Sequence, residues 1–281
     1  MRNNTLILCA AVAVAAILAT PFASAQEKKT PPAKKPAAEA ATKGKGKTAP
    51  DSGAAAYDMI LKKYVKDGKF GYAALKASKA DMAAFKKFMD WQAKADVKAM
   101  SREEQIAFYI NAYNSCCIQA ILDHYPVHSP NDVPGFFDKL KFTVGGEELT
   151  ISLIEYERLI ANYKDMRAHF AVVCADRGCQ PLKPGAWTGA SLNDDLEAAA
   201  KQFVSDKKYF SVDKEKGEIN ISKIFEWYGE KFTKDPERPA AKPELFLLPW
   251  LSGDAKEMLE SGKYKLKIIE WDWVLNETLK K

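Results

Sequence analysis

Apolar residues recur at helical spacing through the first half of the chain. Residues 54–65 and 79–93 each place their apolar side chains three or four positions apart, which gathers them on one face of a helix. Residues 102–124 are apolar nearly all round, and Ser101 with Glu104 forms a capping box at their start. The pattern predicts three helices, of which the third lies at the centre of the core.

The second half mixes short strand-like and helical patterns. Two hairpins are predicted, over 140–151 around Gly145-Gly146 and over 209–221 around Lys216-Gly217. Further helices are expected over 152–163, 191–204, 222–232 and 254–259, a last strand over 266–269, and a loop over 237–249. Ser152 with Glu155 is read as a second capping box. Helices followed by interleaved hairpins and helices predict an α+β fold, with a mostly antiparallel sheet packed against helices.

One short apolar run carries the most reactive side chains of the chain. Phe170 to Val173 predicts a buried strand, with His169 at its entrance and Cys174 at its exit. The chain then turns at 176–178 and reaches Cys179. We therefore expect any chemistry of this protein at the end of this strand.

The beginning of the chain has the pattern of a secretory signal peptide. An apolar run over 6–18 is followed by Ala23-Ser24-Ala25, small residues that suit cleavage after Ala25. Residues 26–54 are rich in Lys, Ala and Pro and lack apolar periodicity, so we expect a disordered linker. A single domain is expected over 55–281, and the protein is expected to be periplasmic or secreted.

The positive charge of the chain is concentrated in the linker. Within the linker, seven lysines against Glu27 and Glu39 give residues 27–50 a charge of +5, and Arg2 adds one charge, whereas the whole chain carries +5. Residues 51–281 therefore carry −1, which argues against a nucleic-acid-binding domain. The basic tail is either a solvated spacer or a loose contact to anionic envelope polymer.

Two asparagines and two cysteines lie inside the predicted central helix. Asn111 and Asn114 are three residues apart, so they share a face, and buried amides need hydrogen-bond partners. Each asparagine either ties a neighbouring loop or serves a site, by orienting a reacting group or donating to an oxyanion. Cys116 and Cys117 are predicted to be packed thiols.

Five segments together resemble the domain of unknown function 547 family. They are Arg102-Glu103-Glu104 leading into Ala107 to Asn114, Gly145-Gly146 with Leu149 to Glu155, His169-Phe170-Ala171 with Cys174 and Cys179, Ser222 to Tyr228, and Asp272-Trp273 with Leu275-Asn276. The chain departs from the family pattern at Tyr109, Tyr156, Asp176 and Gln180. The resemblance covers about 55 to 281 and implies a domain of the papain or transglutaminase type. It implies no particular activity.

Three interpretations of the histidine and the cysteines stay open. His169 and Cys174 are five residues apart, so a regular strand would put them on opposite faces and about 16 Å apart. Cys174 and Cys179 can form a disulfide, since export leads to an oxidising compartment and the mature chain has an even count of four cysteines. One thiol can instead be a nucleophile with His169 as base, oriented by Asp272 or Asn111. In the third interpretation, His169 and both cysteines are metal ligands.

The sequence thus supports two functions. The first is a cysteine-dependent amide hydrolase or acyltransferase of the cell envelope, acting on an envelope peptide or peptidoglycan through His169, Cys174, Cys179, Asn111 and Asp272. The second is a non-catalytic envelope binding or scaffolding module stapled by Cys174 and Cys179. Glu103, Asn114 and Glu155 are candidates for structural or orienting roles. No cofactor, no nucleic acid and no membrane span after signal removal are expected.

Overall fold

The computed structural model describes residues 52–278 of the 281-residue chain. These residues lie in the second of the two compact units of the chain, Thr48–Lys281. The predicted signal peptide and nearly all of the predicted linker lie outside the described residues. Within them, no helix combines the length and the apolar character that crossing a membrane requires.

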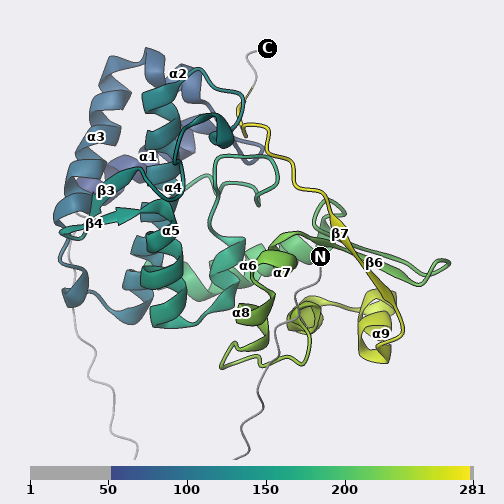
Figure 1. Cartoon of the computed structure of the whole chain (residues 1–281). Helices are drawn as coiled ribbons and strands as arrows, with labels where there is room; N and C mark the ends of the chain where they lie inside the picture. Colours follow the sequence, from purple (N-terminus) through teal and green to yellow (C-terminus); the bar gives the residue numbers. More distant parts are fainter. Residues whose placement is uncertain (1–51, 279–281) are drawn as a thin grey trace, which may run out of the picture. The chain divides into compact units, whose positions relative to one another are not determined.

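The first part of this unit is helical, as the apolar spacing predicts (Figure 1). Its helices are α1 (Ser52–Tyr64), α2 (Tyr72–Ala77), α3 (Lys79–Lys94) and α4 (Arg102–His124), with a 3-10 turn η1 (Val97–Ala99) between α3 and α4. Helices α1 and α3 pack through aromatic side chains, and the Tyr57 and Phe88 rings stack at 4.2 Å. The capping box of Ser101 and Glu104 begins α4, whose side chains are buried nearly all round from Ile106 to Leu122. Two-residue strands β1 (Val65–Lys66) and β2 (Lys69–Phe70) connect α1 to α2.

The described strands form small sheets and not one continuous sheet. The hairpin of β3 (Lys141–Val144) and β4 (Glu147–Thr150) has the predicted bounds and pairs Val144 with Glu147. A separate three-stranded sheet has the order β5 (Phe210–Asp213), β6 (Glu218–Ser222) and β7 (Lys265–Ile269). Strands β5 and β6 are antiparallel, whereas β7 lies parallel to β6. The fold is α+β with mostly antiparallel pairing, as predicted.

The helices of the second half differ more from the pattern. They are α5 (Ile151–Leu153), the π-helix η3 (Ile154–Ala161), α6 (Leu192–Ser205), α7 (Ile224–Trp227), α8 (Gly229–Thr233) and α9 (Gly253–Ser261). Short 3-10 segments are η2 (Pro130–Asp132), η4 (Met166–Phe170), η5 (Gly189–Ser191) and η6 (Pro243–Trp250), the last within the segment expected to be a loop. Thr150, whose side chain accepts from Leu153 N–H, caps the helix that was expected to begin with Ser152 and Glu155. Glu155 is therefore free for another role.

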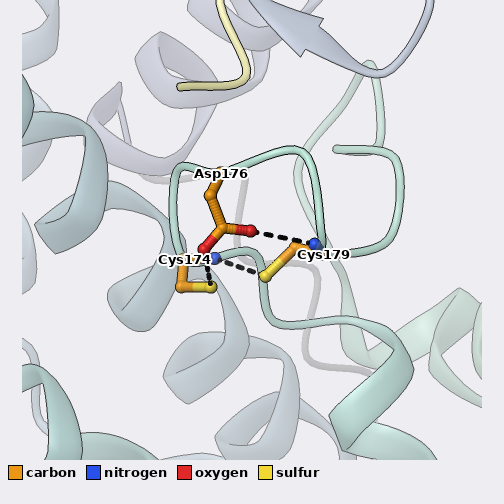
Figure 2. A group of neighbouring side chains, drawn as sticks. All are labelled: Cys174, Asp176 and Cys179. Carbon is orange, nitrogen blue, oxygen red and sulfur yellow. Dashed lines mark hydrogen bonds between the residues drawn. The ribbon is translucent and has the colours of Figure 1, made fainter. Parts of the chain in front are cut away.

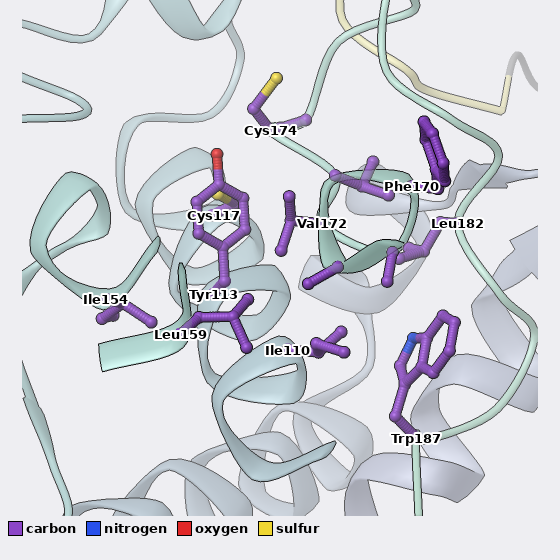
Figure 3. Close-up of a cluster of buried hydrophobic side chains, with 14 of the residues drawn as sticks. Ile110, Tyr113, Cys117, Ile154, Leu159, Phe170, Val172, Cys174, Leu182 and Trp187 are labelled. Carbon is purple, nitrogen blue, oxygen red and sulfur yellow. The ribbon is translucent and has the colours of Figure 1, made fainter. Parts of the chain in front are cut away.

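The prediction of a strand over Phe170 to Val173 is wrong. His169 and Phe170 end the 3-10 helix η4, and the chain continues without strand pairing to Cys174. The run is nevertheless buried, as its composition requires: Phe170, Ala171, Val172 and Val173 are each at most 7% exposed. Figure 3 shows this run beside α4, with Val172 and Cys174 next to Tyr113 and Cys117.

Asn114 supplies the hydrogen bonds that a neighbouring strand would otherwise make. Its Nδ2 donates to the carbonyl of Ala171 at 3.1 Å, and its Oδ1 accepts from Val173 N–H at 2.7 Å. The amide is 3% exposed, so both bonds lie in the core. This interaction holds the segment after His169 against α4 and sets where Cys174 begins.

We expect Asn114→Leu to destabilise the protein by about 2–4 kcal/mol, because it leaves a buried carbonyl and a buried N–H without partners. Gln119→Ala is the matched control on the same helix, since Gln119 bonds only to Asp123 near the surface and should change stability by less than about 0.5 kcal/mol. Urea unfolding followed by tryptophan fluorescence measures both. Equal stability of the two variants would contradict the role given to Asn114.

Candidate functional site

One pocket brings together the histidine and both cysteines of the 169–179 segment. We call it the histidine pocket; its lining includes Tyr113, Glu155, His169, Val172, Cys174, Gly178, Cys179, Gln180, Tyr209, Trp227, Tyr228 and Trp271. The regular strand that would have separated His169 from Cys174 is not formed, so the two side chains reach the same space. The pocket therefore meets the first requirement of a thiol–imidazole site.

The imidazole of His169 is held by a carboxylate. Its Nδ1 lies 3.2 Å from Oε1 of Glu155, in the π-helix η3, and both side chains are buried. Tyr228 packs on the imidazole with ring centroids 4.1 Å apart. A carboxylate beside Nδ1 favours the proton on that nitrogen, which leaves Nε2 as an acceptor. Nε2 is buried and has no hydrogen-bond partner among the described residues.

The two cysteines lie on a loop organised by Asp176 (Figure 2). The Cys174 thiol donates to Oδ2 of Asp176 at 3.1 Å, and Cys179 N–H donates to Oδ1 at 3.0 Å. The Cys174 N–H in turn donates to the Cys179 sulfur at 3.0 Å. Asp176 is 1% exposed, and burial raises the pKa of its carboxyl against the effect of these hydrogen bonds.

The C-terminal segment closes this loop from the other side. Trp271 Nε1–H donates to Oδ2 of Asp176 at 3.1 Å, and Gly178 N–H donates to the carbonyl of Asp272 at 2.7 Å. A Cβ on Gly178 would lie 2.4 Å from the Trp271 indole, so only glycine permits this close approach. Residues nearly a hundred positions apart thus fix one short loop.

All four described cysteines are free thiols. The disulfide of Cys174 with Cys179 accordingly stays a prediction. Cys116 and Cys117 are fully buried, and burial raises the pKa of Cys116 to about 12, as expected of packed thiols. Burial raises the pKa of Cys174 well above its usual value. Burial also raises the pKa of Cys179, which is partly exposed, but hydrogen bonding to the side chain and the N–H of Cys174 opposes this rise. Cys179 is therefore the more accessible and the more acidic of the two loop thiols.

Comparison with protein-family models finds one match, over residues 97–204, to the family described as "Protein of unknown function, DUF547". The match includes α4, Glu155, His169 and the whole cysteine loop.

Residues 97–204 belong to the DUF547 family.

Comparison with curated proteins and with solved structures finds no match to the chain. The papain or transglutaminase likeness therefore stays an expectation from the resemblance alone. The function of the protein has to be argued from its own site.

The two asparagines of α4 serve loops. Asn111 bonds the backbone of Trp187 twice, donating to its carbonyl at 2.8 Å and accepting from its N–H at 3.0 Å. Asn114 likewise bonds the backbone of Ala171 and Val173. Of the two roles that the sequence left open for the asparagines, these bonds are those of the first, tying a neighbouring loop. Neither asparagine lines the histidine pocket.

Two other predicted residues are not at the imidazole. Asp272 is exposed, and its carboxylate accepts from Val274 N–H, so Glu155 and not Asp272 orients His169. Glu103 is exposed in the first turn of α4, where its charge favours the helix terminus. Glu155, a candidate for an orienting role, contacts His169 directly.

The loop can also be considered as a metal site. Ligand atoms of Cys174, Asp176 and Cys179 all lie within 4.8 Å of one another. Asp176 thus stands where the sequence had suggested His169, whose Nδ1 is taken by Glu155. Two thiols and a carboxylate suit a zinc ion with one open position. The three residues nevertheless satisfy one another by hydrogen bonding without a metal.

Sequence reasoning missed Gln180. It was noted only as a departure from the family pattern, yet it lines both the histidine pocket and a second pocket next to it. This charged pocket includes Asp67, Lys69, Asp176, Arg177, Cys179, Lys208 and Asp272. Cys179 and Gln180 lie between the two pockets. The sequence feature that could have pointed to Cys179 and Gln180 is the short motif Cys-x-Asp-x-x-Cys-Gln, which places polar residues next to an apolar run.

We expect iodoacetamide to alkylate Cys179 before the other three thiols, because the others are buried. The thiolate is the reacting form, so the raised pKa predicts a rate that still rises above pH 9.0. Mass mapping of the alkylated protein at a series of pH values measures this, with urea-unfolded protein as the control of ordinary cysteine acidity. A rate that levels off below pH 9.0 in the folded protein would contradict the assignment.

Proposed function

We propose that this DUF547 member is a cysteine-dependent amide hydrolase or acyltransferase. Cys179 is the nucleophile, His169 is the general base and Glu155 orients the imidazole. The observation that carries the proposal is the buried imidazole whose Nδ1 is held by a carboxylate, whose Nε2 is unpartnered, and whose pocket contains the accessible thiol of Cys179. A nucleophile, a base and a third group that orients the base form the general pattern of acyl transfer.

The raised pKa of Cys179 decides how the thiol would be activated. Burial raises the pKa of Cys179 and disfavours the thiolate, so the proposal starts from the neutral thiol. His169 Nε2 therefore accepts the thiol proton as sulfur attacks the carbonyl carbon of the substrate. The tetrahedral intermediate expels an amine, which takes that proton from Nε2 and leaves a thioester on Cys179.

The second half of the reaction uses the same base. Nε2 removes a proton from water, which attacks the thioester, and the proton returns to the Cys179 sulfur as the acid leaves. An amine in place of water gives acyl transfer. Glu155 favours both halves, since its charge stabilises the imidazolium that forms in each.

The lining of the pocket favours a substrate with an apolar or ring-bearing part. Trp227 is 42% exposed, and its ring lies 4.8 Å from that of Trp271. Both tryptophans line the histidine pocket beside the thiol loop. An envelope peptide or a peptidoglycan amide is the substrate class that we propose, and its support is the predicted signal peptide together with this aromatic lining.

We expect His169→Ala to slow acylation of Cys179 at least about tenfold, because the general base is lost. Glu155→Gln keeps an acceptor for Nδ1 but loses the charge, so a decrease of about fivefold is expected. The probe is p-nitrophenyl acetate, and the measurement is the acetyl mass on the Cys179 peptide together with p-nitrophenolate release.

Glu157→Gln is the matched control for this experiment. Glu157 is exposed on the same π-helix as Glu155, so its substitution should leave the rate unchanged. Cys174→Ser should still acquire the acetyl group at Cys179. Acetylation at equal rates in the wild type and in His169→Ala would exclude the general base, and a protein without any acetylated cysteine would favour the binding module.

The compartment is a separate proposal with its own test. We expect the protein expressed with its full chain to be recovered outside the cytoplasm with Gln26 as its first residue, because the small residues before Gln26 suit signal peptidase. N-terminal sequencing of the exported fraction measures this. Recovery only in the cytoplasm with an intact N-terminus would argue against an envelope substrate.

A further inference from the structure

Gln180 carries an amide that the folded protein does not satisfy. The residue is 6% exposed, and neither its Nε2 nor its Oε1 has a hydrogen-bond partner among the described residues. It directly follows Cys179 in the chain and lines both pockets that meet at that thiol. No other described side chain has two buried polar atoms left unpaired.

An unpaired buried amide is costly, so its presence needs a reason. Each buried polar group without a partner costs about 1–3 kcal/mol, and most such groups in folded proteins are paired. Gln92 shows how the same fold treats a glutamine that serves structure. That side chain is fully buried, accepts from the Ser115 hydroxyl at 2.8 Å and lies 3.7 Å from the Cys116 sulfur.

The unpaired groups of Gln180 match the chemistry of an amide substrate. The carboxamide of Gln180 offers N–H donors on Nε2 and an acceptor on Oε1. The C=O and N–H of one peptide residue offer the complementary acceptor and donor, as those of Trp187 do for Asn111. The other unpaired atom of the histidine pocket is Nε2 of His169, the proposed base. The residues that carry the donor, the acceptor and the base thus line the same pocket as Cys179.

We propose that Gln180 binds the backbone of the substrate residue whose carbonyl is attacked, with Nε2–H donating to that carbonyl oxygen and Oε1 accepting from the N–H of the same residue. This inference rests on the proposed function, since it gives the substrate of the same thiol. Donation from Nε2 polarises the carbonyl that Cys179 attacks and strengthens as negative charge develops on oxygen. Acceptance by Oε1 selects a substrate residue that carries a backbone N–H over one of similar shape that lacks it.

The experiment compares two alkylating probes on the full-length protein. Iodoacetamide carries an amide, whereas allyl iodide is a reagent of similar size without one. In the wild type we expect the ratio of their rates at Cys179 to exceed the ratio in urea-unfolded protein by about three- to tenfold, the effect of one or two hydrogen bonds. Gln180→Met should bring the ratio to within about twofold of the unfolded value, with the allyl iodide rate unchanged.

Thermal unfolding of the same variant separates a binding role from a structural one. Gln180→Met should keep or raise the melting temperature, because methionine has a similar shape and removes two unpaired polar groups. Gln92→Met is the matched control, and it should lower the melting temperature because it breaks a buried hydrogen bond. A side chain that serves binding can be replaced without loss of stability, as expected for Gln180→Met. A side chain that serves the fold cannot, as expected for Gln92→Met.

The outcomes distinguish this inference from the function on which it rests. If Gln180→Met leaves the rate ratio unchanged while Cys179 still reacts, Gln180 does not bind the amide and the nucleophile stands. If Gln180→Met is as unstable as Gln92→Met and the ratio is unchanged, Gln180 is structural. If neither probe alkylates Cys179 in the wild type, the proposed function fails and this inference fails with it.

Discussion

The buried carboxylate of Asp176 is the interaction on which the site depends. It joins the Cys174 thiol, the backbone of Cys179 and the Trp271 indole. A carboxylate with 1% exposure is stable in a core only when its oxygens are hydrogen-bonded, and here the bonds come from both ends of one loop and from the C-terminal segment. The same bonds place Cys179 at the pocket and keep Cys174 directed to Asp176.

The histidine side of the pocket is built by different means. Glu155 reaches His169 from a π-helix, and Tyr228 packs on the imidazole, so a pair of buried polar groups is held mainly by one hydrogen bond and ring contacts. Helices of this type often occur at functional sites. Of the described residues with buried polar atoms left unpaired, His169 and Gln180 line this pocket together with Cys179.

The misread segment 170–173 shows where local patterns are insufficient. Its apolar residues predict burial, and each is buried. They also predict a strand, because strand-like composition is the usual way to bury a short run. Here the side-chain amide of Asn114 replaces a strand partner, an interaction between residues nearly sixty positions apart that no local pattern contains. The loss of regular strand geometry then allows His169 and Cys174 to line one pocket.

Periodicity and capping residues determine α1, α3, α4, the hairpin β3–β4 and the mixed α+β class, because these elements depend on neighbours within a few residues. Three features come only from the tertiary structure. They are the contact of His169 with Glu155 and not Asp272, the greater exposure of Cys179 than of Cys174, and the unpaired amide of Gln180. Each depends on distance, burial or a missing partner, and those arise from contacts between segments far apart in the chain.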